Sequence, residues 1–282
     1  MRASTICCFL GVLLLGPQGR CETPQIANPS APVASEIPLY GVSGNPQEYD
    51  IRQGSTPDCF LEAAVAAVVR ISPQTVTEML VDNGNGSVSV TCYGNNSQQT
   101  TVQVEKKDFE ARLLSQDSAS SWITVLQDAY EKLLVTEGLP DSVHNGDGSS
   151  PNHVFAAIYG PEAEVIIAAC DQMSTVGEKA SSRPSTLCTN ASSGELVDGH
   201  CYTVHTANSS HITLRNPWGV VNTNDWGIPI TGGSDIHSLG YGIFEIPTSS
   251  VFHQCTQLTY VDHSNSRRLA RRSPSKLEKS AD

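Results

Sequence analysis

The spacing of apolar residues predicts two helices and a hairpin in the first half of the chain. Residues 58–69 read DCFLEAAVAAVV, an Ala-rich helical segment that Asp58 is expected to cap. Residues 121–135 read SWITVLQDAYEKLLV, with apolar side chains repeating at helical intervals. Residues 88–93 and 101–105 alternate around a Gly-Asn-Asn loop, which indicates a β-hairpin.

The second half of the chain is expected to consist mainly of strands. Gly, Asn and Ser separate short apolar or alternating runs at residues 164–169, 200–207, 211–215 and 241–246. A helical half followed by a strand half predicts an α+β fold. We expect the active site in a cleft between two subdomains, at about residues 39–160 and 161–262.

Both ends of the chain differ from this core in composition. Residues 1–21 combine Arg2, an apolar run and small residues, the pattern of a secretory signal peptide. Residues 22–38 are rich in Pro, Ala and Ser and predict a lead-in or short pro-segment. Residues 263–282 are polar and basic and predict a disordered tail. No apolar run approaches the roughly 20 residues of a membrane span, so no membrane anchor is expected.

Composition narrows the class of protein further. Apolar residues make up 39% and charged residues 16% of the 282 positions, which is typical of globular enzymes. A formal net charge of −12 argues against nucleic acid as a partner. Four sequons fit passage through a glycosylating pathway, at Asn85, Asn95, Asn190 and Asn208. We therefore expect a secreted, extracellular, monomeric glycoprotein.

Nine cysteines are consistent with an oxidising compartment. Two of them leave with the predicted signal peptide, Cys21 lies near its end, and Cys59 is set aside for chemistry. The others, expected to pair where geometry allows, are Cys92, Cys170, Cys188, Cys201 and Cys255. A Cys170–Cys188 disulfide is favoured because it would close a local loop rich in Ser and Thr.

Cys59 begins the more strongly predicted helix. The partial positive charge and unpaired N–H groups of a helix N-terminus would lower the pKa of a thiol there. The alternative is a buried structural cysteine. Gln53, six residues earlier across a turn, would direct a side-chain N–H toward the space beside the Cys59 backbone N–H. Two converging donors stabilise a developing oxyanion.

A base and an orienting amide follow in the second half. His200 begins one predicted strand, and Asn216 follows the next. Adjacent antiparallel strands would bring the two side chains together, as a Cys-His-Asn set requires. Spacing alone leaves His205 and His211 as rival bases.

The segments that carry these residues resemble the protease core of calpains. QGSTPDCFLEAA resembles the segment with the oxyanion glutamine and the nucleophilic cysteine, and DGHCYTV with ITLRNPWG resembles the histidine and asparagine segments. The string Asn-Pro-Trp-Gly is especially specific. Weaker matches are SWITVLQDAYEKL and GIFEIPTSSVFHQCTQLTYV, so the resemblance covers about residues 40–261.

This resemblance implies a papain-type fold and a role for each of five residues. The roles are nucleophile for Cys59, general acid/base for His200, orienting amide for Asn216, oxyanion donor for Gln53 and shielding indole for Trp218. It excludes both rival histidines. The implied function is a secreted cysteine endopeptidase that hydrolyses protein or peptide substrates through a thioester acyl-enzyme.

Some positions depart from the calpain pattern. Pro57 and Phe60 stand where calpains usually have Gly and Trp, and Cys201 replaces a small residue. These departures motivate a second hypothesis, a catalytically weak or inactive module that binds proteins through its cleft. Transglutaminase-type acyl transfer is a third hypothesis, disfavoured because an Asn-Pro-Trp motif stands in place of an Asp.

Calpain cores bind one calcium ion in each half, which makes calcium a candidate ligand here. Asp50 and Glu137 match acidic ligands of the first site, and Val42 and Gly44 would offer backbone carbonyls. Alternatively, Asp50 is a turn residue and Glu137 a solvated helix end. The second site lacks the expected carboxylates around Asn222 and residues 240–244. We therefore predict that no cofactor is required and keep first-site calcium as a hypothesis.

Overall fold

The computed structural model describes residues 38–54, 56–106, 120–136, 149–190, 195–221 and 236–263. All of them belong to one structural unit, Val33–Asp282. Below, the first half denotes the described residues up to 162, and the second half those from 163 to 263. The predictions for Glu137, Asn222, the signal peptide and the basic tail fall outside the described residues.

The described helices lie mostly in the first half, as the periodicity predicted. They are α1 (Cys59–Ile71), α2 (Pro73–Met79), α4 (Trp122–Thr136), α5 (Pro151–Tyr159), α6 (Met173–Ala180) and α7 (Thr248–Phe252), with 3₁₀ turns η2 (Glu48–Asp50), η3 (Gly160–Glu162) and η4 (Cys170–Gln172). The helices predicted at residues 58–69 and 121–135 are confirmed as α1 and α4.

Two antiparallel sheets complete the fold. The first-half sheet has the order β1-β2-β3, from β1 (Leu80–Asp82), β2 (Ser87–Tyr93) and β3 (Gln99–Glu105). The second-half sheet has the order β4-β10-β5-β6-β7-β9-β8, from β4 (Glu164–Ala168), β5 (Ser185–Thr189), β6 (Cys201–Ala207), β7 (His211–Arg215), β8 (His237–Gly240), β9 (Ile243–Pro247) and β10 (Cys255–Asp262). The α+β prediction is therefore confirmed.

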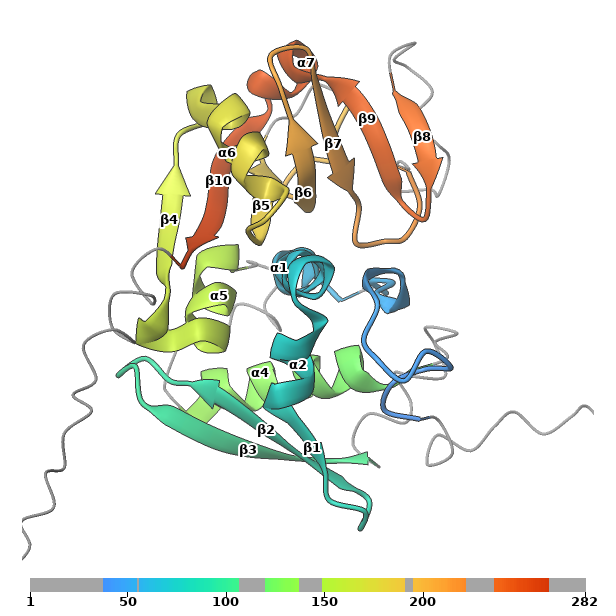
Figure 1. Cartoon of the computed structure of the whole chain (residues 1–282), viewed down its shortest axis with the longest axis vertical. Coiled ribbons are helices and arrows are strands. Elements are labelled where there is room, and N and C mark those ends of the chain that lie inside the picture. The colour runs from blue at the N-terminus through green and yellow to red at the C-terminus, as the bar shows by residue number, and fades with distance from the viewer. Residues whose placement is uncertain are drawn as a thin grey trace, which may run out of the picture. The chain divides into compact units, whose positions relative to one another are not determined.

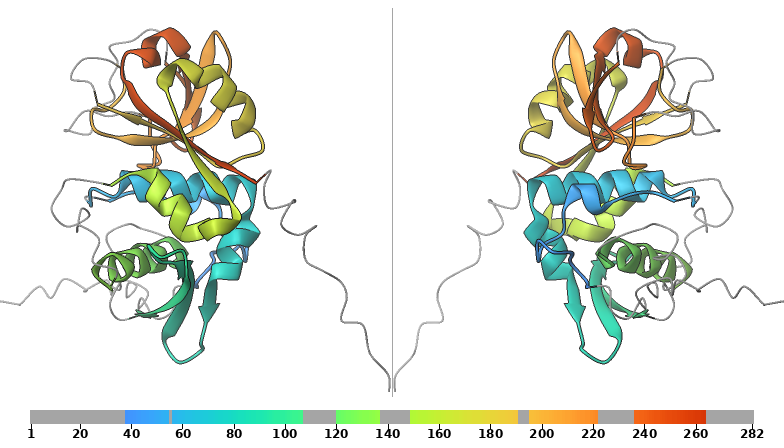
Figure 2. Two further views of the ribbon diagram at one scale, coloured as in Figure 1. Left: turned by 90° about the vertical axis from the view of Figure 1, so that its left-hand side faces the viewer. Right: turned by 90° about the vertical axis from the view of Figure 1, so that its right-hand side faces the viewer.

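Helix α1 is buried on all sides because it lies between the two halves. Every residue from Phe60 to Val69 is buried, which is expected of a helix that is apolar all round. Figures 1 and 2 show α1 between the second-half sheet and the helices of the first half. Its backbone also contacts the sheet, since Thr203 Oγ1 in β6 donates to the carbonyl of Ala63 at 2.8 Å.

Strand β6 presents different residues to the two sides of the second-half sheet. Thr203 and Cys201 point toward α1, whereas Tyr202 and Val204 belong to a separate apolar core. A register shift between Val204 and Thr206 marks a bulge. Consequently Ala207 faces helix α6 instead of α1.

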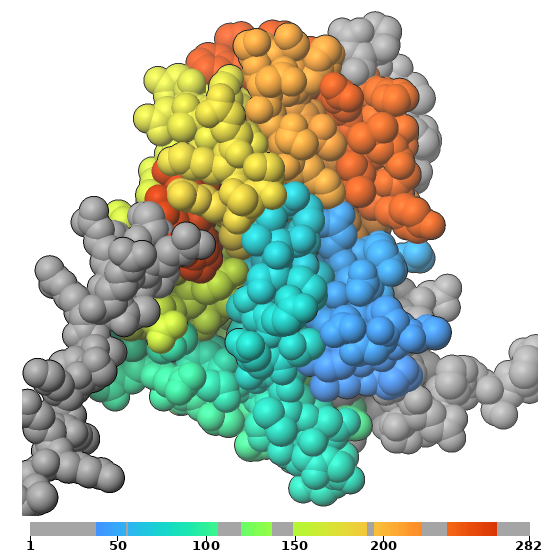
Figure 3. Space-filling view, viewed as in Figure 1, coloured from blue at the N-terminus to red at the C-terminus, as the bar shows by residue number. Residues whose placement is uncertain are grey.

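The segment ahead of α1 lies against the second half. Figure 3 shows the blue residues around η2 lying beneath the orange strands. The backbone N–H of Gln53 donates to the carbonyl of Pro217 at 2.9 Å, which joins the two halves directly. The segment that carries Gln53 is therefore positioned by the loop after β7.

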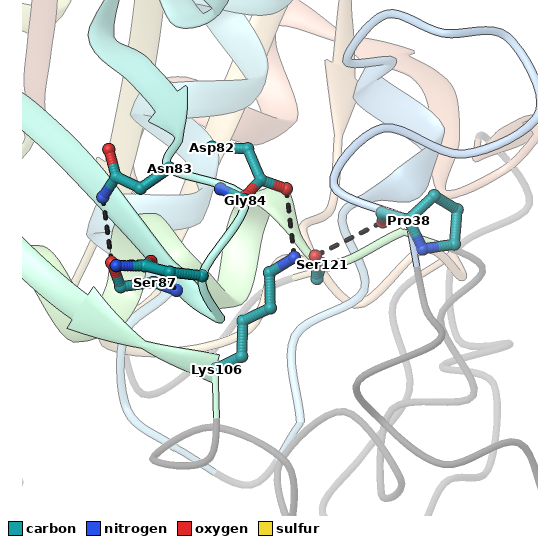
Figure 4. Close-up of polar contacts among 8 residues, drawn as sticks. Pro38, Asp82, Asn83, Gly84, Ser87, Lys106 and Ser121 are labelled. Atoms are coloured by element: carbon teal, nitrogen blue, oxygen red, sulfur yellow. Dashed lines mark hydrogen bonds and ion pairs between the residues drawn. The ribbon is translucent and has the colours of Figure 1, made fainter.

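Polar contacts close the β1–β2 turn and attach the start of the described chain (Figure 4). Asp82 accepts from Lys106 Nζ at 3.0 Å and from the Gly84 N–H at 2.9 Å. Ser121 Oγ donates to the carbonyl of Pro38 at 3.3 Å. These contacts secure the outer part of the first half.

The disulfides differ from the sequence-based expectation. Cys170 pairs with Cys255 and Cys188 pairs with Cys201, so the predicted Cys170–Cys188 bond is wrong. Strands β5 and β6 place Cys188 directly opposite Cys201, with 4.1 Å between their Cα atoms. The Ser- and Thr-rich composition of the intervening loop favoured the predicted pair, but the sheet register determines the partners.

Two elements of the fold, β5 and α5, carry weak local signals. Strand β5 reads STLCT, yet four of its five residues are buried in the middle of the sheet. Helix α5 begins at a proline after a predicted loop.

Within the described residues no single helix is long and apolar enough to cross a membrane; only α1 and α2 together reach that threshold, as a pair bent by 112°.

Gly177 is predicted to be essential for the packing of α6 on β6. A Cβ at this position would overlap Ala207, including its backbone nitrogen. Gly177→Ala should therefore lower the free energy of unfolding by about 1–3 kcal/mol, although alanine favours helices. Urea unfolding would measure this. Thr175→Ala on the exposed face of α6 is the matched control, and equal stability of the two variants would contradict the packing argument.

Candidate active site

Cys59 is the first residue of α1 and lies outside both disulfides. The backbone N–H groups of Phe60 and Cys201 hydrogen-bond its sulfur. One donor belongs to the helix start and the other to the first residue of β6. The sulfur is thus held at the contact between the two halves.

Asp58 stands at the N-cap position, but its carboxylate does not cap the helix as expected. Its backbone carbonyl accepts from the N–H groups of Leu61 and Glu62 at 2.9 and 3.0 Å. Its side chain instead accepts from Gln127 Nε2 of α4 at 2.7 Å. The Asp58 side chain therefore leaves the Phe60 N–H to the sulfur.

The environment of Cys59 favours the neutral thiol. Burial raises its pKa to about 11, and the carboxyls of Asp58 and Glu62 act in the same direction. The two N–H donors lower the pKa but are outweighed. The expectation that the helix start lowers this pKa is therefore wrong for the state described here. Desolvation destabilises the thiolate more than the two N–H donors stabilise it.

His200 and Asn216 meet as the sequence predicted. Their side chains lie 3.0 Å apart, from Nε2 to Oδ1, and both residues are buried. The same Oδ1 accepts from the Trp218 backbone N–H at 3.0 Å, which identifies this atom as the amide oxygen. Nε2 must therefore donate, so the neutral ring carries its lone pair on Nδ1. The amide thus selects the tautomer of the imidazole.

Two aromatic rings surround the imidazole. The indole of Trp218 lies 4.6 Å from the His200 ring and the phenol ring of Tyr202 lies 4.9 Å away, measured between centroids. Burial lowers the pKa of His200 to about 4, although the bond to Asn216 acts in the opposite direction. The indole position is compatible with the predicted shielding of the His200–Asn216 hydrogen bond.

The rival histidines have carboxylate partners elsewhere. His205 Nε2 lies 3.1 Å from Glu48 Oε1. His211 is exposed, with Nδ1 3.7 Å from Glu245 Oε1. Of the three candidate bases, His200 is the one that the structure brings to Asn216.

Gln53 lies between the loop after β7 and the turn before α1. Its backbone N–H is bound by Pro217, and its Nε2 donates to the carbonyl of Thr56 at 2.7 Å. An amide nitrogen carries two hydrogens, so one remains for another acceptor. The side chain is therefore held against the turn before α1, with part of its donor capacity in use.

Two residues that sequence reasoning did not select also shape the site. Arg215, fully buried, donates from Nη2 to the carbonyl of Ile51 at 2.6 Å and so ties β7 to the Gln53 segment. Gly242 has a φ of +77°, and a Cβ there would lie 2.8 Å from the Asn216 carbonyl oxygen. The Gly-Tyr-Gly string was the available signal for a close backbone approach.

Acidic side chains behind the nucleophile are buried and share a donor. Glu62 is fully buried and accepts from Gln127 Nε2 at 2.9 Å. Burial and the neighbouring Asp58 raise the pKa of Glu62 well above its usual value, while Arg215 acts in the opposite direction. Burial therefore disfavours a negative charge on Glu62, close to the Cys59 sulfur.

The predicted calcium ligands do not form a complete set among the described residues. Asp50 Oδ2 accepts from the indole N–H of Trp122 at 2.8 Å and from the Gln47 backbone N–H at 3.0 Å. Val42 has an exposed side chain, and the N–H of Gly44 closes a turn with the Gly41 carbonyl at 2.9 Å. No three His, Cys, Asp or Glu side chains of the described ranges form a metal site. Calcium binding stays a prediction.

Comparison with known proteins identifies similar chains. Residues 33–229 match the family described as calpain family cysteine protease. Calpain-9 of Mus musculus is 28% identical over 214 residues, which is 65% of this chain and 30% of that protein. Calpain-9 of Rattus norvegicus gives the same identity and coverage. The match thus spans less than a third of these relatives.

The lowered pKa of His200 predicts a specific loss of stability in acid. The unfolded chain takes up this proton near pH 6.5 and the folded chain only near pH 4, so stability falls as the pH drops through that interval. Between about pH 7 and about pH 4.5, the free energy of unfolding of the wild type should fall by about 2–3 kcal/mol more than that of His200→Gln. Urea unfolding at both pH values measures this difference.

The exposed His211 provides the control for that measurement. His211→Gln should lose as much stability as the wild type over the same interval. Equal losses in the wild type and His200→Gln would show that the imidazole of His200 is not kept neutral by folding.

Proposed function

The chain belongs to the calpain family of cysteine proteases, and from that premise we propose that it is an endopeptidase with Cys59 as its nucleophile. In this proposal His200 is the general base and Asn216 orients its imidazole. The proposal is supported above all by the buried Nε2–Oδ1 bond of 3.0 Å, next to the residue whose N–H binds the Cys59 sulfur.

The chemistry that follows uses the tautomer fixed by Asn216. His200 Nδ1 takes the thiol proton, and Cys59 Sγ attacks the peptide carbonyl carbon. The imidazolium then donates that proton to the leaving amine as the C–N bond breaks, which leaves a thioester. Water, deprotonated by the same imidazole, hydrolyses the thioester and restores the thiol.

The two pKa directions restrict how the thiolate forms. Burial raises the pKa of Cys59 and lowers the pKa of His200, so both directions disfavour complete proton transfer before attack. We therefore propose that the proton moves as the sulfur–carbon bond forms, or that substrate binding brings the two groups into a more favourable environment.

Gln53 is proposed to stabilise the oxyanion together with the Cys59 backbone N–H. The support is its bond from the backbone N–H to Pro217 and its second, uncommitted side-chain hydrogen. Trp218 is proposed to exclude water from the His200–Asn216 bond, since its ring lies against the imidazole.

We propose that the protease is secreted and acts on protein or peptide substrates. The N-terminal signal pattern motivates secretion. Two disulfides between second-half elements are in keeping with an oxidising compartment. The substrate class follows from the chemistry of the family and from the −12 net charge, which disfavours nucleic acid.

A second candidate is a binding module with little or no activity. The observations that favour it are the raised pKa of the partly buried Cys59 thiol and the packing of Phe60 against Tyr130, at 6.1 Å between ring centroids. An electrophilic peptide probe separates the two candidates. A folded protein whose Cys59 ignores the probe would be a binding module.

Proteolysis by the secreted, purified chain should depend on Cys59. We expect casein digestion by the wild type, loss of activity after iodoacetamide treatment, and a fall of at least about 10²-fold in Cys59→Ala. Cys92→Ala, which changes a cysteine buried in the first-half core, is the control and should keep its activity. Equal activity of the wild type and Cys59→Ala would rule out the proposed nucleophile.

Calcium dependence is measured in the same assay. Because N–H donors already stabilise one oxygen of Asp50, we propose that calcium is not required and expect digestion to continue in EDTA. The prediction is wrong if EDTA abolishes casein digestion and added calcium restores it. If calcium is required, Glu137→Gln tests whether Glu137, the other predicted carboxylate ligand, contributes to the calcium dependence of digestion.

A further inference from the structure

The Cys188–Cys201 disulfide lies beside the candidate catalytic residues. Cys201 directly follows His200 in the chain, and its partner stands directly opposite on β5. The bond joins residues only 13 positions apart. It links two adjacent strands at the point where β6 begins.

The disulfide also lies on the side of the sheet that faces the nucleophile. Cys201 and Thr203 are two residues apart in β6 and therefore share a face. Thr203 donates to the Ala63 carbonyl in α1, which identifies this face as the one toward the helix. Cys201 belongs to the same apolar cluster as α1, and both Cys59 and Cys188 pack against that cluster.

Hydrogen bonds already hold the start of β6 to the end of β5. The Thr189 N–H donates to the His200 carbonyl at 2.8 Å, and the Thr189 hydroxyl donates to the Val197 carbonyl at 2.6 Å. The His200 N–H donates to Thr189 Oγ1 at 3.2 Å. The disulfide adds a covalent connection between the two neighbouring residues, Cys188 before Thr189 and Cys201 after His200. The backbone on both sides of the His200–Cys201 peptide is thus constrained.

We propose that the Cys188–Cys201 disulfide is a positioning element of the proposed protease site. It keeps the Cys201 N–H on the Cys59 sulfur and the His200 ring at Asn216 by fixing the start of β6 on β5. This inference rests on the proposed function. It requires Cys59 as a thiol and the neighbouring pair as a disulfide in the same active molecule.

This requirement has a consequence for reducing agents. A dithiol reagent that opens the bond gives it two electrons and two protons, forms the thiols of Cys188 and Cys201 and itself becomes a cyclic disulfide. Mild reductant should therefore increase activity by keeping Cys59 reduced, whereas stronger reduction should lower activity again. A maximum in activity against reductant concentration is expected.

The second disulfide, Cys170–Cys255, provides a matched control. It connects η4 to β10 and closes 85 residues of chain instead of 13. The longer loop gives it the larger expected effect on global stability. It does not join β5 to β6. If the disulfides act only through stability, removing Cys170–Cys255 should lower activity more than removing Cys188–Cys201. If Cys188–Cys201 positions the site, its removal should lower activity more.

The experiment compares the wild type with Cys188→Ser/Cys201→Ser and Cys170→Ser/Cys255→Ser, each as the full secreted chain. Loss of the first pair should lower kcat by about ten- to a hundredfold with little change in KM. It should also change the rate and pH profile of Cys59 alkylation by iodoacetamide. Loss of the second pair should lower Tm but leave kcat and the alkylation profile close to wild type.

The outcomes separate this inference from the proposed function. If the wild type does not digest casein, the proposed function fails, and the alkylation profile still tests positioning. If the wild type is active and Cys188→Ser/Cys201→Ser has the same kcat and alkylation profile, positioning is wrong while the protease remains. Recovery of Cys59 in a disulfide with Cys188 or Cys201 in the active protein would also overturn the inference.

Discussion

The candidate site depends on one packing contact, the N-terminal turn of α1 against the start of β6. The helix belongs to the first half and the strand to the second, yet Thr203 binds the Ala63 carbonyl and the Cys201 N–H binds the Cys59 sulfur. Burial of α1 on all sides secures this contact through apolar area removed from water. Separating the halves would remove a hydrogen-bond donor from the sulfur.

Two hydrogen bonds between the halves fix the segment before α1 relative to the loop after β7. The guanidinium of Arg215 binds the Ile51 carbonyl, and the Pro217 carbonyl binds the Gln53 N–H. Both second-half residues flank Asn216, which orients the imidazole. The segment that carries the proposed oxyanion donor is therefore positioned by the loop that carries the orienting amide. A single displacement of that loop would affect both parts of the proposed machinery.

Burial has opposite consequences for geometry and for charge at this site. It protects the His200–Asn216 bond and holds the ring between Trp218 and Tyr202. It also disfavours both the thiolate and the imidazolium, since neither ion is well solvated there. The site is accordingly ordered by hydrogen bonds, and burial disfavours both ionic forms. In the proposed mechanism, substrate and transition-state contacts provide the stabilisation that water does not.

The α+β class, the main helices and strands, and the residue types of the candidate site follow from the amino-acid pattern alone, because periodicity and motif strings are local properties. That pattern left the base open among three histidines until the family resemblance was considered. The partners of Cys170 and Cys188, the raised pKa of Cys59, and the contacts of Arg215 and Gly242 become visible only in the folded chain. These properties depend on strand register, backbone approach and exclusion of water between residues far apart in the chain, which no local pattern specifies.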